Sequence, residues 1–394
     1  MSHIADLISH HCPNGVARKP LKELASIQNG YAFNSKEFNT LNLGLPLVRI
    51  RDVNTGFSNT YYSGSYKPEY IIQNGDLLVG MDGDFKPIRW SYGKALLNQR
   101  VCKINPNPKH LNKNYLFHFL FIALEQISSK IQGSTVKHLS TRDLNEYPIP
   151  VPPLEVQDEI VRILDSFTEL EAELEAELEA RRKQYEYYRD SLLKDAEQCA
   201  SWACIGDISL RSVSGGTPLK SKSEYYGGNI PWLRTQEVHF NEIYETENYI
   251  TELGFENSSA KWVNPDSVVV AISGATAGRS AIIKKSLTTN QHCAVFEIDS
   301  AICNYRYVYY WLANNYLELK SLGRGARGDL NLQIIKNFQI PVPPLAEQER
   351  IVAILDKFDA LVNDLSSGLP AEIEARRKQY EYYRDQLLTF TPVK

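Results

Sequence analysis

The chain has 394 residues, 43% hydrophobic and 23% charged, which allows about two to four folded domains and argues against a wholly disordered protein. Its six cysteines form no CxxC pair, so reduced thiols are favoured over a disulfide framework or a zinc site. No apolar run approaches the ~20 residues of a membrane span, and no basic segment precedes an apolar stretch at the N-terminus. The sequence predicts a cytoplasmic protein.

The net charge of −4 is unevenly distributed. Residues 15–148 contain 17 Lys and Arg but 10 Asp and Glu, whereas residues 149–194 contain 6 basic and 12 acidic residues. Because phosphate contacts depend on local fields, the acidic total does not exclude DNA as a partner of the basic region.

The first region predicts a strand-rich α+β globule. Short β-type runs such as "LPLVRI" (45–50) and "DLLVG" (76–80) are interrupted by Gly, Asn and Ser, and an aromatic helix is expected near 114–130. The prolines of "IPVPP" (149–153) end this globule and favour the start of a helix.

A long helix with a coiled-coil seam is predicted after these prolines. From Ile160 onward, apolar residues recur every three or four positions. Within the helix lies "ELEAELEAELEA" (169–180), in which the leucines are expected to face a second helix and the glutamates to face water. An acidic partner site is the alternative interpretation. Each four-residue unit adds about 6 Å of helix and about 40° of net rotation.

The remainder repeats the same order. "IPVPPLEVQDEIVRILDSF" (149–167) matches "IPVPPLAEQERIVAILDKF" (340–358), and the globules share weaker matches. These are "PLVRIRDV" (46–53) with "PWLRTQEV" (231–238), "GDLLVGMDG" (75–83) with "PDSVVVAISG" (265–274), "NQRVC" (98–102) with "NQHCA" (290–294), and "NYLFHFL" (114–120) with "NYRYVYY" (304–310). A second aromatic helix is expected near 304–321.

This order predicts two globules separated by two long antiparallel helices forming a coiled coil, with pseudo-twofold tandem-repeat symmetry. The second helix contains "SSGLP" (366–370), where it should bend or restart. The predicted segments are a first globule at 1–148, a central helix at 149–195, a second globule at 196–339 and a C-terminal helix at 340–394.

The eleven residues "ARRKQYEYYRD" occur at 180–190 and identically at 375–385. One interpretation is a basic helix end that complements the helix dipole, with tyrosines used for packing. Identity in both copies favours a shared binding surface for two copies of one partner. The predicted partner-binding residues are Arg181, Arg182, Tyr185, Tyr187, Tyr188, Arg376, Arg377, Tyr380, Tyr382 and Tyr383.

The doubled "IPVPPLxxQ", "IVxILDxF" and "RRKQYEYYRDxLL" motifs resemble the specificity subunit of type I restriction-modification systems, in the class with a tetrapeptide repeat in the central helix. The resemblance covers essentially the whole chain. It implies two target recognition domains that each read half of a bipartite, asymmetric DNA site. It also implies two methyltransferase subunits bound to the helices, two restriction/motor subunits joining through them, and S-adenosylmethionine, ATP and Mg on those partners rather than on this chain.

The residues themselves predict no catalysis, which agrees with a non-catalytic subunit of a DNA-methylation complex. "NPNP" (105–108) lacks the Asn/Asp-Pro-Pro-aromatic pattern of an adenine methyltransferase, and "GATAGRS" (274–280) lacks the spacing and lysine of a P-loop. Asp76 with Asp84 and Lys86 is only faintly like a nuclease metal site. Two alternatives remain at this point: a self-contained nuclease or methyltransferase, and a coiled-coil scaffold without DNA specificity.

DNA readers need cationic or amide side chains on exposed loops, for phosphates and for base edges. Arg49 and Arg234 share an aligned position in a strand-like run, and a role in the fold, by pairing with Asp52 and Glu237, is the alternative interpretation. The predicted DNA-binding residues are Tyr31, Asn34, Ser35, Lys36, Arg49, Arg51, Lys86, Arg89, Ser134, Thr135, Lys137 and His138 in the first globule, and Thr217, Lys220, Lys222, Arg234, Gln236, Thr276, Arg279, Arg324 and Arg327 in the second.

Overall fold

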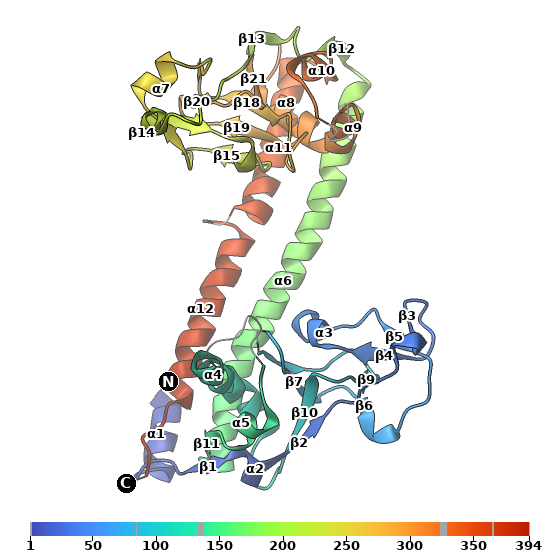
Figure 1. The fold of residues 1–394 in the computed structure, drawn as a ribbon, viewed down its shortest axis with the longest axis vertical. Helices are drawn as coiled ribbons and strands as arrows, with labels where there is room; N and C mark the ends of the chain where they lie inside the picture. The colour runs from blue at the N-terminus through green and yellow to red at the C-terminus, as the bar shows by residue number, and fades with distance from the viewer. Residues whose placement is uncertain (1, 84, 132–137, 324–328, 365, 394) are drawn as a thin grey trace. The chain divides into compact units, whose positions relative to one another are not determined.

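A computed structural model describes residues 2–83, 85–131, 138–323, 329–364 and 366–393. The chain divides into two compact units: unit 1 comprises Met1–Glu175 and Glu372–Lys394, and unit 2 comprises Ala176–Ala371. Each unit therefore contains one globule, the start of the helix that follows it, and the end of the other long helix (Figure 1). No helix in the described ranges is long and apolar enough to cross a membrane.

The globule of unit 1 is built from short strands and a single longer helix, α4. Its helical elements are α1 (Ser2–His11), α2 (Leu21–Leu24), η1 (Ser35–Glu37), α3 (Ile50–Thr55), η2 (Pro68–Tyr70), α4 (Lys113–Lys130) and α5 (Thr141–Asn145). Its strands are β1 (Arg18–Pro20), β2 (Ala25–Asn29), β3 (Phe38–Asn39), β4 (Leu45–Val48), β5 (Tyr61–Tyr62), β6 (Ile71–Ile72), β7 (Leu77–Gly80), β8 (Pro87–Arg89), β9 (Ala95–Leu97), β10 (Val101–Pro106) and β11 (Pro148–Pro150).

Two main sheets form this globule, in the orders β2-β10-β7-β8 and β3-β5-β4-β9-β6, and β1 pairs with β11. Strand β7 shows why its residues are all apolar. Leu77 and Val79 pack into the core shared with α4 and the long helices, whereas Leu78 packs into a second core with Val48 and Ile72. Alternate side chains of a strand face opposite sides, so a strand buried on both faces needs a continuous apolar run.

The globule of unit 2 repeats this plan, and in the chain it lies between the two long helical segments. Its helical elements are η3 (Ser223–Tyr225), η4 (Thr235–Glu237), α7 (Glu252–Glu256), α8 (Tyr305–Asn314), α9 (Tyr316–Ser321) and α10 (Leu332–Lys336). Its strands are β12 (Ser201–Cys204), β13 (Ser209–Ser214), β14 (Tyr226–Leu233), β15 (Glu242–Ile243), β16 (Tyr249–Ile250), β17 (Trp262–Val263), β18 (Ser267–Ala271), β19 (Ser280–Ile283), β20 (Leu287–Thr289), β21 (Cys293–Ile298) and β22 (Gln339–Val342).

The sheets of unit 2 have the orders β13-β21-β18-β19-β15 and β16-β14-β20-β17, and β12 pairs with β22. Strand β18 is buried on both faces, as β7 is: Val268 and Val270 face the core that contains α8, and Val269 faces a second core. The predicted α+β class with tandem repetition is confirmed.

The long helices are α6 (Leu154–Glu197), α11 (Leu345–Asn363) and α12 (Leu369–Leu388). Figure 1 shows α6 running without a break through the "ELEA" repeat. In unit 1, α6 and α12 run antiparallel, because Phe167 stacks on Tyr383 while Glu171, one turn later, pairs with Arg377. The predicted restart of the second helix near 366–370 is also confirmed, since α11 ends at Asn363 and α12 begins at Leu369.

The predicted alignment of the aromatic helices is wrong by two residues. Asn112 caps α4 and Asn304 caps α8, each accepting a hydrogen bond from the backbone amide two residues later. "NYRYVYY" therefore matches the segment that begins at Asn112, not at Asn114. Both asparagines precede the same aromatic run, so either could serve as the cap in a reading of the sequence alone.

Candidate nucleic-acid interface

A strand-to-helix turn occupies the same place in both globules. Strand β4 lies parallel to β9, strand β14 lies parallel to β20, and a short helix follows each at once. The backbone amide of Arg49 donates to Asp52 (2.9 Å) and that of Arg234 donates to Glu237 (3.0 Å). Arg49 and Arg234 therefore begin a helical turn, and their predicted location within a strand-like run is wrong.

The two arginines differ in how their guanidinium groups are used. The Arg49 guanidinium lies 3.7 Å from Asp52 and also donates to Thr60, so it is occupied within unit 1. The predicted pairing of Arg49 with Asp52 is confirmed. In unit 2 the side chain of Arg234 instead lines an open cavity. Burial raises the pKa of both Asp52 and Glu237 from the ordinary carboxyl values.

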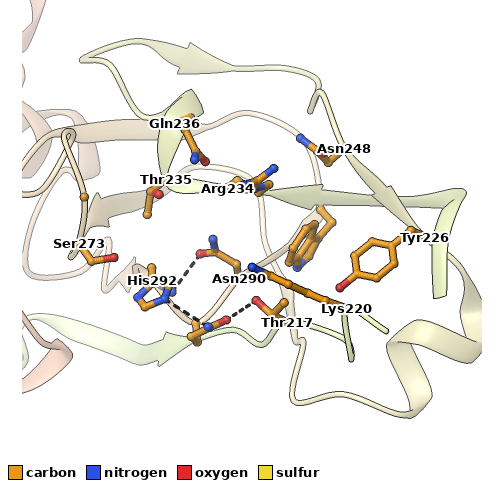
Figure 2. Close-up of a pocket in the computed structure, with 13 residues that line it drawn as sticks. Thr217, Lys220, Tyr226, Arg234, Thr235, Gln236, Asn248, Ser273, Asn290 and His292 are labelled. Atoms are coloured by element: carbon orange, nitrogen blue, oxygen red, sulfur yellow. Dashed lines mark hydrogen bonds between the residues drawn. The ribbon is translucent and has the colours of Figure 1, made fainter. Parts of the chain in front are cut away.

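This cavity in unit 2 has a volume of about 580 Å³ and a mostly polar lining (Figure 2). It brings together four residues predicted from the sequence: Thr217, Lys220, Arg234 and Gln236. The others in the lining, which sequence reasoning missed, are Tyr226, Trp232, Thr235, Asn248, Ser273, Gly274, Asn290, Gln291 and His292. The repeated "NQ" before β10 and β21 could have identified Asn290 and Gln291 from the sequence, because it marks where a buried strand begins in each globule.

Hydrogen bonds fix part of the cavity lining and leave other side chains of the lining without a partner. Thr217 donates to Gln291, whose amide nitrogen lies 3.2 Å from Nε2 of His292. Within the described ranges, the side chains of Lys220, Arg234 and Gln236 have no hydrogen-bond or ion-pair partner. Donors and acceptors without a partner in the protein are available to phosphates and base edges.

The remaining predicted residues of unit 2 are less available. Lys222 lies 3.4 Å from Glu224, and the buried hydroxyl of Thr276 donates to the carbonyl of Thr235. Arg279 contacts His239 at 2.7 Å, on the turn formed by "GATAGRS" between β18 and β19. Arg324 and Arg327 lie outside the described residues.

In unit 1, one group of predicted residues is exposed around the loop after β2 and on α3. Tyr31 is 49% exposed and packs beside Tyr70, and Asn34 caps η1 by accepting a hydrogen bond from the Lys36 amide. The exposed predicted residues of this unit also include Ser35, Arg51 and Lys86.

A second group is occupied by the fold or lies outside the described part of the chain. Arg89 is 2.8 Å from Asp165 and lies over the ring of Phe117, which gives it a packing role. His138 approaches Asp82 (2.6 Å) and Arg100 (3.1 Å). Ser134, Thr135 and Lys137 fall in the segment that the structure does not describe.

Arg100 is an exposed cation that the sequence analysis missed. Its backbone has φ of 70°, a left-handed conformation that is uncommon for a residue with a β-carbon. The guanidinium is anchored through Nη1 by Asp82 and His138. His292 occupies the equivalent backbone position in unit 2, because both carbonyls accept a hydrogen bond from the residue that follows a buried strand. That residue is Met81 after β7 in unit 1 and Ile272 after β18 in unit 2.

One stacked contact of the duplicated segment is repeated in each unit. Tyr383 stacks on Phe167 in unit 1 at 5.2 Å, and Tyr188 stacks on Phe358 in unit 2 at 5.5 Å. The outer tyrosines, Tyr187 and Tyr382, are 69% and 60% exposed.

The other predicted partner-binding residues range from buried to exposed. Tyr380 is buried, Tyr185, Arg181 and Arg376 are half-buried, and Arg182 and Arg377 are exposed. Arg377 pairs with Glu171 and Glu175 of the "ELEA" repeat. The surface that both copies offer in common is therefore centred on Tyr187 and Tyr382.

An aspartate of the long helix joins each globule to its helices. In unit 1, Asp165 accepts hydrogen bonds from Arg89 (2.8 Å) and His118 (3.0 Å), and the other ring nitrogen of His118 contacts Tyr380 (2.9 Å). In unit 2, Asp356 accepts from Arg306 and from Tyr310, which stands where unit 1 has His118. Burial lowers the pKa of His118, although Asp165 opposes this shift.

A buried glutamine explains the "IPVPPLxxQ" motif. Gln157 accepts a hydrogen bond from the Asn112 amide (2.8 Å) and donates to the Pro152 carbonyl (2.8 Å). Gln348 does the same with Asn304 (2.7 Å) and Pro343 (2.8 Å). Each glutamine therefore ties the start of a long helix to the cap of the aromatic helix.

The described residues contain no group of three or more His, Cys, Asp and Glu that could hold a metal ion. Asp76 is engaged by Lys103 at 2.9 Å, and Asp84 lies outside the described part of the chain. Among the described residues, the geometry offers polar surfaces at strand ends.

Comparison with known proteins identifies the class to which these tandem units belong. The family model described as the type I restriction modification DNA specificity domain matches residues 13–180 and 202–375. The EcoR124I/EcoR124II specificity subunit of Escherichia coli is 39% identical over 290 residues, covering 70% of this chain and 71% of that protein. The EcoBI specificity subunit of Escherichia coli is 30% identical over 396 residues, covering 92% and 83%.

The fold is also similar to that of solved specificity subunits. The S subunit of a type I restriction-modification system from M. genitalium matches with a TM-score of 0.60 and 16% identity, over 95% of this chain and 96% of that one. The chain belongs to the type I restriction-modification specificity family. It is a specificity subunit, the non-catalytic component that recognises the DNA target.

Proposed function

We propose that this subunit reads a bipartite, asymmetric DNA site, with one half-site for each globule, in the cytoplasm. It also binds two methyltransferase subunits, one at each copy of "ARRKQYEYYRD", and two restriction/motor subunits join through them. S-adenosylmethionine, ATP and Mg belong to these partners. In this proposal residues 1–148 and 196–339 are target recognition domains, and 149–195 and 340–394 are the helices that bind the partners.

One observation carries the proposal: the two units share the same helix packing and present the same tyrosine outward. The stacked pairs Tyr383–Phe167 and Tyr188–Phe358 set the same local geometry, so Tyr187 and Tyr382 are offered in equivalent surroundings. Exposed tyrosines at a repeated surface are typical anchors of protein interfaces. Two equivalent surfaces favour two copies of one partner.

The test is native mass spectrometry of the complex with the methyltransferase subunit. Tyr187→Ala should lose one methyltransferase copy, and Tyr187→Ala with Tyr382→Ala should lose both. Tyr249→Ala removes an exposed tyrosine from β16 and serves as the matched control, with two copies expected. Two bound copies in the folded double variant would contradict the proposal.

A further inference from the structure

The strand-to-helix turn places Arg51 of unit 1 and Gln236 of unit 2 at equivalent positions. Each lies two residues after the arginine whose amide donates to a carboxylate at the third following residue, Asp52 or Glu237. Each also follows a strand that lies parallel to its neighbour, β9 or β20. The backbone therefore presents these two side chains from the same point of the two globules.

Arg51 is held in a way that leaves its fork available. Its side chain is 68% exposed, and its Nε lies 3.8 Å from Oδ1 of Asp52. Within the described ranges, the two terminal nitrogens of Arg51 have no partner. A carboxylate behind Nε restrains an arginine and leaves the paired terminal donors to face outward.

Gln236 is equally unoccupied but has different chemistry. It is exposed and lines the cavity of unit 2 beside Lys220 and Arg234. Its amide has no hydrogen-bond partner among the residues that the structure describes. The two cations of the same lining are of the kind that contacts phosphates and so fixes the register of a protein on DNA, and the amide is of the kind that reads a base edge.

We infer that Arg51 and Gln236 are specificity-determining residues, one for each half-site. Arg51 reads a guanine through its two terminal nitrogens, and Gln236 reads an adenine through its amide. The chemistry follows from the major groove: a guanidinium fork matches O6 and N7 of guanine, and a carboxamide matches N6 and N7 of adenine. This inference rests on the proposed function, because it requires that each globule reads its own half-site.

Reciprocal exchange of the two side chains tests the inference. The full-length chain, assembled with its methyltransferase subunits, is used to select bound sequences from a randomised DNA duplex library. Gln236→Arg should change one A·T pair to G·C in one half-site, and Arg51→Gln should change one G·C pair to A·T in the other. On duplexes that differ only at that pair, each preference should reverse by about 5- to 140-fold in affinity.

Charge-matched controls separate base reading from general electrostatics. Gln333→Arg adds the same charge to α10 of unit 2, and Arg142→Gln removes the same charge from α5 of unit 1. Both controls should select the same DNA sequence as the wild-type protein. If an exchanged variant does not assemble, Gln236→Ala and Arg51→Ala should each relax one pair and no other.

The outcomes distinguish the two levels of the account. A wild-type complex that selects no bipartite sequence removes the proposed function. If the wild type selects one, the inference is overturned when the exchanged or alanine variants keep the same preference, when both exchanges act on one half-site, or when a control produces the same change.

Discussion

The parts of units 1 and 2 that hold the helices are nearly identical, whereas the parts that face outward at the strand ends are not. Gln157 and Gln348 make matching bonds to a proline carbonyl and to an asparagine amide, within 0.1 Å of each other. At the strand ends, in contrast, the equivalent positions differ: Arg51 of unit 1 corresponds to Gln236 of unit 2, and Arg100 corresponds to His292. One region repeats its chemistry and the other replaces it.

The difference indicates which surfaces must do the same task twice. Matching contacts between globule and long helix suit two copies of one partner, because both copies need the same contact geometry in their unit. Different side chains on a shared backbone turn suit two different DNA sequences, because base identity is read by the donors and acceptors that a side chain presents. The proposed function therefore assigns assembly and specificity to different residues of a single fold.

The largest effect is expected from the "ELEA" repeat (169–180), of which the second helix carries only one similar unit, "EIEA" (372–375). Deleting one four-residue unit removes about 6 Å of helix and about 40° of net rotation, close to the 34–36° between successive base pairs. The spacer between the half-sites should shorten by about one base pair while both half-sites stay the same. Methylation mapping measures the spacer, and an unchanged spacer in an active variant would show that the helix does not set the distance.

Removing the buried glutamines tests whether the contacts at the starts of the two long helices are equivalent. Gln157→Leu and Gln348→Leu each leave buried backbone groups without partners, so each should lower the free energy of unfolding of its own unit by about 2–4 kcal/mol. Urea unfolding followed by hydrogen exchange assigns the loss to a unit. Gln333→Leu, at an exposed site, is the control. A loss of stability in only one of the two variants would show that the glutamine contacts are not equivalent in the two units.

The smallest effect is a pH dependence of stability from the contact between His118 and Asp165, which only unit 1 contains. In unit 1, His118 contacts Asp165 on α6, Tyr380 on α12 and, through charge, Arg89 and Arg384. Burial lowers its pKa from the ordinary value of 6.5, so the unfolded chain takes up a proton first as the pH falls. Unit 1 should therefore lose stability as the pH falls from 7 to 5.

Unit 2 provides an internal control, because Tyr310 replaces His118 and does not titrate in this range. The pKa of Asp165 is also lowered, but its contribution is lost only near and below the ordinary carboxyl range, at more acid pH. Hydrogen exchange between pH 7 and 5 can compare the two units after correction for the intrinsic rate. His118→Gln should abolish the excess loss in unit 1, and an unchanged loss would assign it to another group.

The sequence was sufficient to predict the tandem plan, the α+β class, the long helices and the restart near 366–370. These features depend on local periodicity and on repeated motifs, which can be read without tertiary contacts. The predicted register of the aromatic helices was wrong because asparagine, a residue type that commonly caps helices, occurs at both 112 and 114. Only the contact with Gln157 selects Asn112.

The cavity could not be predicted, because it draws its lining from segments separated by up to 75 positions, from Thr217 to His292. The role of each tyrosine in "ARRKQYEYYRD" also depends on tertiary packing. The letters are identical, yet Tyr380 meets His118 while Tyr185 packs near Phe358. Identical sequence predicted a shared surface, but only the packing separates the exposed tyrosines from the buried ones.

In the proposed function, one globule can be exchanged without affecting the half-site that the other reads. Replacing residues 205–339 with the corresponding globule of another specificity subunit, and mapping methylated sites in a host that also expresses the methyltransferase, tests it most directly. We predict that one half of the methylated sequence changes while the other half stays the same. A change in both halves would contradict the account.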